Sequence, residues 1–231
     1  MPDLRRSCLI LILVVLPAWS ASAATPPGPD QLRQLLSEAS VRIEIDSPIE
    51  DGLCTGWVGW SEDNRSAVYT AGHCSRDGAR YRVLLVNGEV TYAVGLTKWE
   101  ELDLMALWIP RGRLRTLRDW KPIPNGPFRA LYILQDERNL RVLERTVTRI
   151  FWEIRFENHP AAVAIPLYAV PGTSGAPVLD MADGLLVGMV VGFLLDRPDI
   201  AAVLPAHQIY DALVAAGRSR PFRQIPLTVP P

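Results

Sequence analysis

A long series of short apolar runs, separated by turn-forming residues, is the feature of this sequence that most restricts its fold. About six such runs lie between Ser40 and Pro110, and a second set extends from Phe128 to Ala206. Polar pairs such as Asp77-Gly78 and Asn87-Gly88 lie between the runs and are typical of tight turns. Many short strands at this spacing are typical of β-sandwiches and β-barrels, so we predict a mostly β fold.

The two sets of predicted strands are separated by a segment that breaks the pattern. Residues 111–126 combine charge, prolines and an Asn-Gly turn, and we interpret them as a linker. Leucines at helical spacing predict a short helix before Ser40, and a second helix follows the last strand. The expected segments are 24–39 as an N-terminal extension with the first helix, 40–115 as the first β domain, 116–216 as the second β domain with the last helix, and 217–231 as a proline-rich tail.

Residues 1–23 have the layout of a secretory signal peptide. Two arginines precede an apolar run that starts at Cys8, and small residues ending in an A-x-A site follow. We predict cleavage after Ala23 or Ala24. A membrane anchor is the alternative, but the run is shorter than the roughly 20 apolar residues that spanning requires, and it meets Pro17. We therefore expect an exported protein, periplasmic or fully secreted, without stable membrane insertion.

Charge and cysteine content exclude several classes of protein. The 24 Lys and Arg residues nearly balance 25 Asp and Glu residues, so nothing indicates a nucleic-acid partner. Cys54 and Cys74 remain after signal cleavage, and two cysteines in an exported chain predict one disulfide. A zinc site is less favoured, because His73 beside Cys74 has no C-x-x-C motif and only two other histidines to complete a ligand set. We expect no metal and no cofactor.

The stretch VPGTSGAPV carries the first candidate for catalysis. Ser174 lies between Gly172 and Gly175, which can adopt positive φ angles and expose the hydroxyl on a tight turn. The amides of Gly172 and Ser174 can then point into one concavity and hold an oxyanion. On its own this pattern is weak, because most such segments are simply turns.

Two other stretches supply the groups that a serine nucleophile needs. His73 ends the apolar run VYTAGHCS, and Asp103 opens the apolar run DLMALW. A serine hydroxyl needs a base to take its proton, and the base needs an acid to orient it. We therefore predict a triad in which His73 is the base, Asp103 orients it and Ser174 attacks. The structural alternatives are a β-strand corner at His73 and a solvated strand-end aspartate at Asp103.

The sequence contains two other histidines. His159 and His207 are most simply structural or surface residues. A rival scheme reads Ser174, a following aspartate and His207 as the Ser–Asp–His order of α/β-hydrolases. That scheme requires a G-x-S-x-G elbow between a strand and a helix, whereas Ser174 is followed by GAPVLDM.

TAGHC, DLMAL and GTSGAPV, in the order His, Asp, Ser, resemble the motifs of chymotrypsin-type serine peptidases. The similarity extends over residues 38–216 and is greatest to the compact bacterial trypsin-like group that includes the HtrA catalytic domain. It implies an all-β fold of two six-stranded antiparallel β-barrels with short terminal helices and the active site between the barrels. We expect no PDZ module after Leu213, in contrast to the HtrA proteins.

The resemblance also assigns a disulfide and a specificity pocket. It pairs Cys54 with Cys74, beside the catalytic histidine. It places Tyr168 at the base of the substrate pocket, where no carboxylate attracts Lys or Arg. Val190, Val191, Gly192 and Phe193 would complete an apolar or small pocket. Thr173 replaces the aspartate that pairs with a new N-terminus in animal digestive relatives, so we expect no such activation switch.

The resulting prediction is an exported serine endopeptidase that hydrolyses polypeptide substrates through an acyl-enzyme. The alternative is a catalytically inert protein of the same fold that binds or scaffolds a partner in the cell envelope. The proline-rich tail is a candidate contact for such a partner, although its composition equally fits a disordered end.

Overall fold

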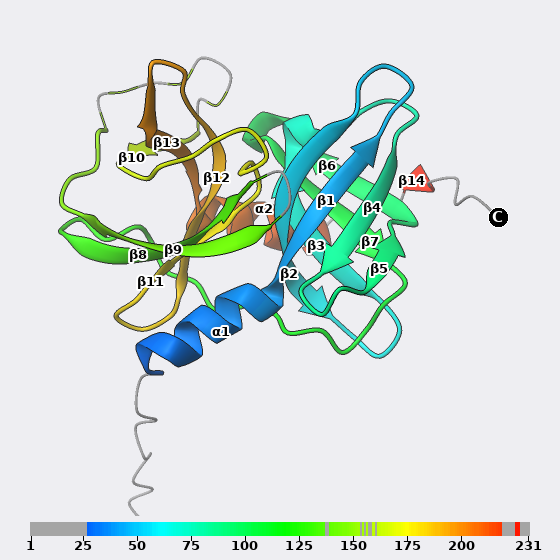
Figure 1. The fold of residues 1–231 in the computed structure, drawn as a ribbon, viewed down its shortest axis with the longest axis horizontal. Coiled ribbons are helices and arrows are strands. Elements are labelled where there is room, and N and C mark those ends of the chain that lie inside the picture. Colours follow the sequence, from blue (N-terminus) through cyan, green and yellow to red (C-terminus); the bar gives the residue numbers. More distant parts are fainter. Residues whose placement is uncertain are drawn as a thin grey trace, which may run out of the picture.

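The computed structural model describes residues 27–136, 139–152, 154, 156, 159, 161–218 and 225–226. The predicted signal peptide and its cleavage site lie outside these residues. The described chain is mostly β, as predicted, and forms two curled antiparallel sheets that lie side by side with two helices against them (Figure 1). No helix in the described ranges is long and apolar enough to cross a membrane.

The first sheet is built from the N-terminal half of the chain and one segment of the tail. Its strands pair in the order β14-β6-β7-β3-β2-β1-β4-β5. Their bounds are β1 (Ser40–Asp46), β2 (Gly52–Ser61), β3 (Ser66–Ala71), β4 (Arg80–Leu85), β5 (Val90–Tyr92), β6 (Gly95–Trp99), β7 (Leu104–Ile109) and β14 (Ile225–Pro226).

The second sheet is built from the C-terminal half. Its strands pair in the order β10-β13-β12-β11-β8-β9. Their bounds are β8 (Phe128–Gln135), β9 (Leu140–Val147), β10 (Val163–Ile165), β11 (Pro177–Asp180), β12 (Leu186–Leu194) and β13 (Arg197–Pro205).

Side-chain alternation explains why these segments form curled sheets. In β1, Val41, Ile43 and Ile45 are buried while Arg42 and Glu44 are only partly so. This period of two directs one face of the strand into a barrel core and the other outward. By contrast, the residues of β7 are buried throughout.

Helices close the ends of the two sheets. Helix α1 (Pro29–Ala39) directs Leu32, Leu36 and Ala39 into the core and packs on β8 and β9. Helix α2 (Ala206–Arg218) follows β13 directly and packs on β12 and β13. The connection from β7 to β8 passes between the sheets: the amide of Leu117 donates to the carbonyl of Val58, and the amide of Lys121 donates to that of Leu186.

The strand inventory differs from the prediction in two places. The first sheet has eight strands instead of six, because the run TYAVGLTKW divides into β5 and β6 and because Ile225–Pro226 pairs with β6. The long run from Arg141 was predicted to hold two strands or one bent strand, and it forms the single strand β9 followed by an isolated bridge at Phe151.

The predicted disulfide is present and joins β2 to the segment that follows β3. Cys54 and Cys74 are bonded across a sequence separation of 20 residues, and both are buried. Cys74 ends the short 3-10 helix η1 (Gly72–Cys74), which also contains His73. The bond therefore ties the histidine segment to the centre of the first sheet.

We predict that replacing both Cys54 and Cys74 with Ala lowers the free energy of unfolding by about 3 kcal/mol, because the unfolded chain regains the entropy of a 20-residue loop. Urea unfolding of the purified protein measures this difference. Treating the parent protein with a reductant should reproduce the loss, and a loss below about 1 kcal/mol would contradict the assigned role.

Candidate active site

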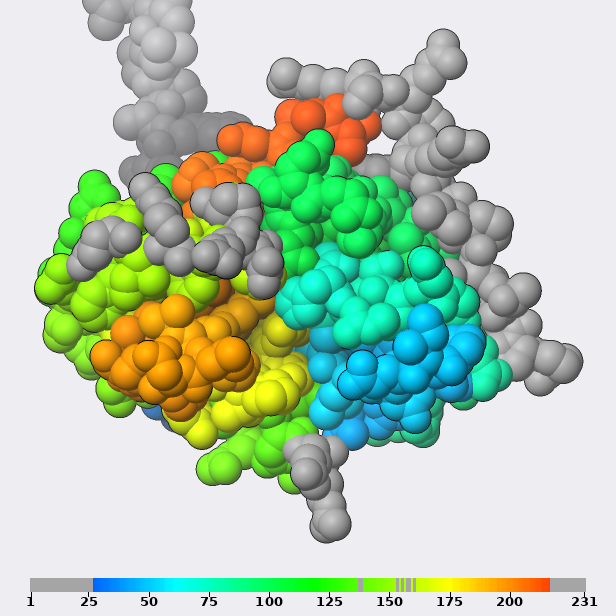
Figure 2. Space-filling view, turned by 90° about the horizontal axis from the view of Figure 1, so that it is seen from above, coloured from blue at the N-terminus to red at the C-terminus, as the bar shows by residue number. Residues whose placement is uncertain are grey.

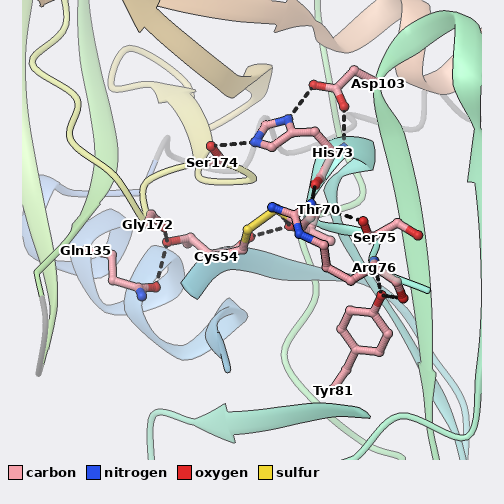
Figure 3. Close-up of a disulfide and its surroundings, with 12 residues drawn as sticks. Cys54, Thr70, His73, Ser75, Arg76, Tyr81, Asp103, Gln135, Gly172 and Ser174 are labelled. Atoms are coloured by element: carbon pink, nitrogen blue, oxygen red, sulfur yellow. Dashed lines mark hydrogen bonds and ion pairs between the residues drawn. A yellow bond between two sulfur atoms is a disulfide. The ribbon is translucent and has the colours of Figure 1, made fainter. Parts of the chain in front are cut away.

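His73 lies at the junction of the two sheets, on the 3-10 turn that follows β3. Its side chain is 42% exposed, so a substrate can reach the ring. The segment is fixed on its other side by Arg76, whose guanidinium donates to the His73 carbonyl oxygen and whose amide donates to the Tyr81 hydroxyl at 2.9 Å. Together with the disulfide, these contacts limit the freedom of the histidine backbone (Figure 3).

Asp103 holds His73 at two points. It ends the 3-10 helix η2 (Glu100–Leu102) in the left-handed region, with φ of 52°. One carboxylate oxygen, Oδ1, accepts the backbone amide of His73 at 2.5 Å, and the other, Oδ2, lies 2.8 Å from the ring Nδ1. A carboxylate in these positions fixes both the ring orientation and the tautomer that keeps Nε2 free of a proton.

Ser174 reaches His73 from the other sheet. Its Oγ lies 3.0 Å from Nε2 of His73, as Figure 3 shows. The Ser174 hydroxyl is thus within hydrogen-bonding distance of the His73 ring, and the His73 ring is within hydrogen-bonding distance of the Asp103 carboxylate, as predicted. The three residues are nevertheless far apart in the sequence. Their order allows a proton to pass from Ser174 to His73 while Asp103 stabilises the imidazolium.

The turn that carries Ser174 contains two backbone amides, those of Gly172 and Ser174, that can serve as oxyanion donors. Gly172 and Gly175 have φ angles of +94° and +91°, which favour glycine. The amide of Thr173 donates to the carbonyl of Val170 at 3.0 Å. Within the described part of the chain, the amides of Gly172 and Ser174 donate to no protein acceptor. They are therefore available to accept an oxyanion as a hydrogen-bonding partner, and their role as an oxyanion hole stays a prediction.

Buried polar contacts join this turn to the first sheet. The amide of Thr55 donates to the carbonyl of Ser174 at 2.8 Å, and the Thr70 hydroxyl donates to the carbonyl of Thr55 at 2.7 Å. The Thr55 hydroxyl lies 2.9 Å from both the Gly172 carbonyl oxygen and the Gln135 amide oxygen, and it can donate its single proton to one of them at a time. The Ser174 turn is therefore positioned by β2 and β3.

His159 is the residue that the sequence interpretation missed. Its Nδ1 lies 2.9 Å from Oδ2 of Asp103, and its ring centroid lies 5.6 Å from that of His73. The ring is turned so that Nδ1 is buried without a well-aligned hydrogen bond. No signal in the segment ENHP indicated this position, because His159 lies in a loop with no regular apolar pattern.

These contacts determine the ionisation of Asp103. Burial by itself raises the pKa of the carboxyl, but the close Nδ1 groups of His159 and His73 and their positive charge lower it by more. The net result is a pKa below the ordinary aspartate value. Asp103 is therefore ionised at neutral pH.

The predicted pocket residues divide into two groups. Val191, Gly192 and Phe193 line a cavity of about 530 Å³ beside His73 and Ser174. Val190 is buried, and its backbone pairs with Gly175 and Ala176. Tyr168 is 46% exposed and does not line this cavity.

The cavity lies where the two sheets meet. His73, Lys98, Glu100 and Asp103 line it from the first half, and His159, Ser174 and residues 191–193 line it from the second. Figure 2 shows one face of this junction, where the yellow and orange segments of the second half lie against the cyan and blue segments of the first. Ser174 makes its described hydrogen bond to His73, and none to His207 occurs among the described residues.

The lowered pKa of Asp103 predicts a pH dependence of stability. At pH values between the pKa of Asp103 in the folded protein and the ordinary aspartate pKa of about 4, the unfolded chain binds more protons than the folded chain. This contribution is therefore complete above about pH 4 and is lost as the pH falls through the folded pKa. We expect Asp103→Asn to destabilise the protein at neutral pH and the difference from the parent to shrink in acid. Urea unfolding between neutral and acidic pH measures this, and a constant difference would contradict it.

The sequence matches the family of the trypsin-like peptidase domain over residues 54–189. No curated protein matches the chain. Among solved structures, the chain is similar to the active form of the Rv3671c protease from M. tuberculosis, with a TM-score of 0.66 and 18% identity over 93% of this chain and 92% of that one.

The HtrA-type protease AlgW, solved with a tripeptide, is also similar, with a TM-score of 0.68 and 19% identity over 82% of this chain and 63% of that one. At these identities the structural likeness shows the fold alone. The family match covers more than half of the sequence and includes the segments that carry His73, Asp103 and Ser174. The chain therefore belongs to the trypsin-like peptidase family of serine peptidases.

Proposed function

We propose that the protein is a serine endopeptidase in which Ser174 is the nucleophile, His73 the general base and Asp103 the residue that orients His73. The observation that carries this proposal is the pair of contacts at His73: Nε2 is 3.0 Å from Ser174 Oγ and Nδ1 is 2.8 Å from Asp103 Oδ2. These distances support a tautomer in which Nδ1 donates its proton to Asp103 and the lone pair of Nε2 faces the Ser174 hydroxyl.

The reaction then follows the acyl-enzyme route. Ser174 Oγ attacks the scissile carbonyl carbon while His73 takes its proton, and the amides of Gly172 and Ser174 hold the developing oxyanion. His73 returns the proton to the leaving amine. A water molecule, deprotonated by the same imidazole, next attacks the ester at Ser174 and releases the second product.

The surroundings of Ser174 support a polypeptide substrate. The cavity is open to solvent and is lined by Val191, Gly192 and Phe193 on the side of the second sheet. An apolar wall of this kind favours a small or apolar side chain next to the scissile bond.

Export is the second part of the proposal. Residues 1–23 have the composition of a signal peptide, and the Cys54–Cys74 disulfide suits an oxidising compartment such as the periplasm or the extracellular medium. The two observations are independent of each other, and both favour a protein that acts outside the cytoplasm.

We predict that Ser174→Ala abolishes covalent labelling by a fluorophosphonate probe, because it removes the hydroxyl that His73 activates for attack on phosphorus with loss of fluoride. His73→Ala should lower peptidase kcat/KM by about 10⁴-fold or more, whereas the control His207→Ala should leave it near the parent value. Mass spectrometry of the labelled peptide and assays on a peptide library measure these effects.

Labelling at a residue other than Ser174, or greater sensitivity to the His207 substitution, would contradict the assignment. A folded parent protein that reacts with no serine-directed probe would favour the inert alternative.

We further predict that the exported protein begins at Ala24 or Thr25. Expression of the full chain with its own N-terminus, followed by fractionation and N-terminal sequencing, tests this. Retention of Met1 on the folded, disulfide-bonded protein would contradict the export proposal.

A further inference from the structure

Three potential metal ligands meet at one point beside the proposed catalytic serine. His73 Nδ1 and His159 Nδ1 lie 2.8 and 2.9 Å from the same oxygen, Oδ2 of Asp103. The three ligand atoms all lie within 4.8 Å of one another. Two imidazoles and a carboxylate are a donor set that suits zinc, with a fourth position left for water.

The second histidine is not accounted for by the proposed reaction. Asp103 already orients His73 through both of its oxygens. His159 Nδ1 nevertheless lies at ion-pair distance from Oδ2 and is buried without a well-aligned hydrogen bond. A buried nitrogen that faces a carboxylate without a well-aligned hydrogen bond is open to a further partner, and beside two other ligand atoms that partner can be a metal ion.

The site can accept an ion with small movements. Tetrahedral zinc holds nitrogen and oxygen ligands at about 2.0–2.2 Å, which separates neighbouring ligand atoms by roughly 3.3 Å. The two distances to Oδ2 must therefore lengthen by about half an ångström. The two imidazole nitrogens, which lie within 4.8 Å of each other, must reach the same separation. A cavity of about 160 Å³ adjoins Asp103 and His159 and gives the His159 ring space to adjust.

The local charge favours a cation. Glu100 and Glu101 line the same small cavity as Asp103 and His159. Two positive groups lie nearby: Lys98 forms an ion pair with Glu100 at 3.0 Å, and the Arg76 guanidinium donates to the His73 carbonyl oxygen. With Asp103 included, three carboxylates outnumber these two cations, so the described surroundings keep a net negative charge.

We propose that His73, Asp103 and His159 form an inhibitory site for a divalent transition-metal ion, for which zinc is the representative. Binding of the ion depends only on these three side chains. Its inhibitory effect rests additionally on the proposed catalytic roles of His73 and Ser174.

Inhibition follows from the tautomer of His73. A metal on Nδ1 occupies the lone pair there, so the proton of the neutral imidazole must move to Nε2 and no net proton is lost. Nε2 then donates to Ser174 Oγ and can no longer accept its proton. At the same time the ion takes the Asp103 oxygen that stabilises the imidazolium. The Ser174 hydroxyl is left without a base, and removal of the metal makes Nε2 of His73 available as a base again.

The experiment uses purified protein without an affinity tag and zinc ion as the probe. Competition with a chromophoric chelator measures zinc affinity, and the rate of fluorophosphonate labelling at Ser174 measures reactivity. We expect one zinc ion per chain, a labelling rate that falls in proportion to zinc occupancy, and full recovery with EDTA. His159→Gln should weaken zinc binding by at least the roughly 10- to 100-fold that loss of a supporting partner costs.

Two control variants separate this proposal from the proposed function. His207→Gln removes a histidine outside the cluster and should leave zinc affinity and zinc sensitivity unchanged. Ser174→Ala should keep zinc affinity while losing labelling. Equal zinc affinity in His159→Gln and the parent would overturn the metal site, and tight binding that leaves labelling unaffected would overturn the inhibition. Absence of labelling in zinc-free parent protein would count against the proposed function, while the chelator titration would still decide whether the metal site exists.

This proposal departs from the expectation of no metal. That expectation rested on the missing C-x-x-C motif and on the small number of histidines, whereas the three ligands come from segments that are far apart in the sequence.

Discussion

The contact between Thr55 and the Ser174 turn is the constraint on which the site depends, because it sets how the two sheets approach each other. The amide of Thr55 donates to the Ser174 carbonyl at 2.8 Å, and Gly175 follows without a side chain. A Cβ atom at Gly175 would lie 1.9 Å from the Thr55 carbonyl oxygen. Only glycine allows this approach, and its φ of +91° also completes the turn that presents the serine hydroxyl. Backbone geometry at the junction therefore places the nucleophile opposite the histidine.

The burial of the Asp103 carboxylate where the two sheets meet determines which charged and polar groups must surround it. Asp103 is 13% exposed, and such a group is stable as an anion only when donors surround it. The backbone amide and ring of His73 supply two donors, and His159 approaches the same carboxylate. The interactions that keep Asp103 ionised also orient the proposed base. They also gather the three ligand atoms of the metal site, so catalysis and inhibition would use the same atoms.

The sequence predicted the features that a short segment determines by itself. It missed the features that depend on contacts between distant segments. The segments FRALYILQ and SVRIEID correspond to β8 and β1, because each carries its own apolar pattern. His73, Asp103 and Ser174 could be proposed because each lies in a short motif at a strand end or a turn, and the Cys54–Cys74 pairing came from the family resemblance. His159 could not be found this way, since only the folded loop brings it to Asp103. The same holds for the pairing of Ile225–Pro226 with β6 and for the exposure of Tyr168.

The two sheets bring a hydroxyl, an imidazole and a carboxylate into contact and leave two amides without a protein acceptor among the described residues. A crystal structure of the fluorophosphonate adduct would show whether these groups act together. We expect phosphorus bonded to Ser174 Oγ, a phosphoryl oxygen accepting hydrogen bonds from the amides of Gly172 and Ser174, and His73 still held by Asp103. An adduct whose phosphoryl oxygen faces away from these amides, with His73 separated from both Asp103 and Ser174, would contradict it.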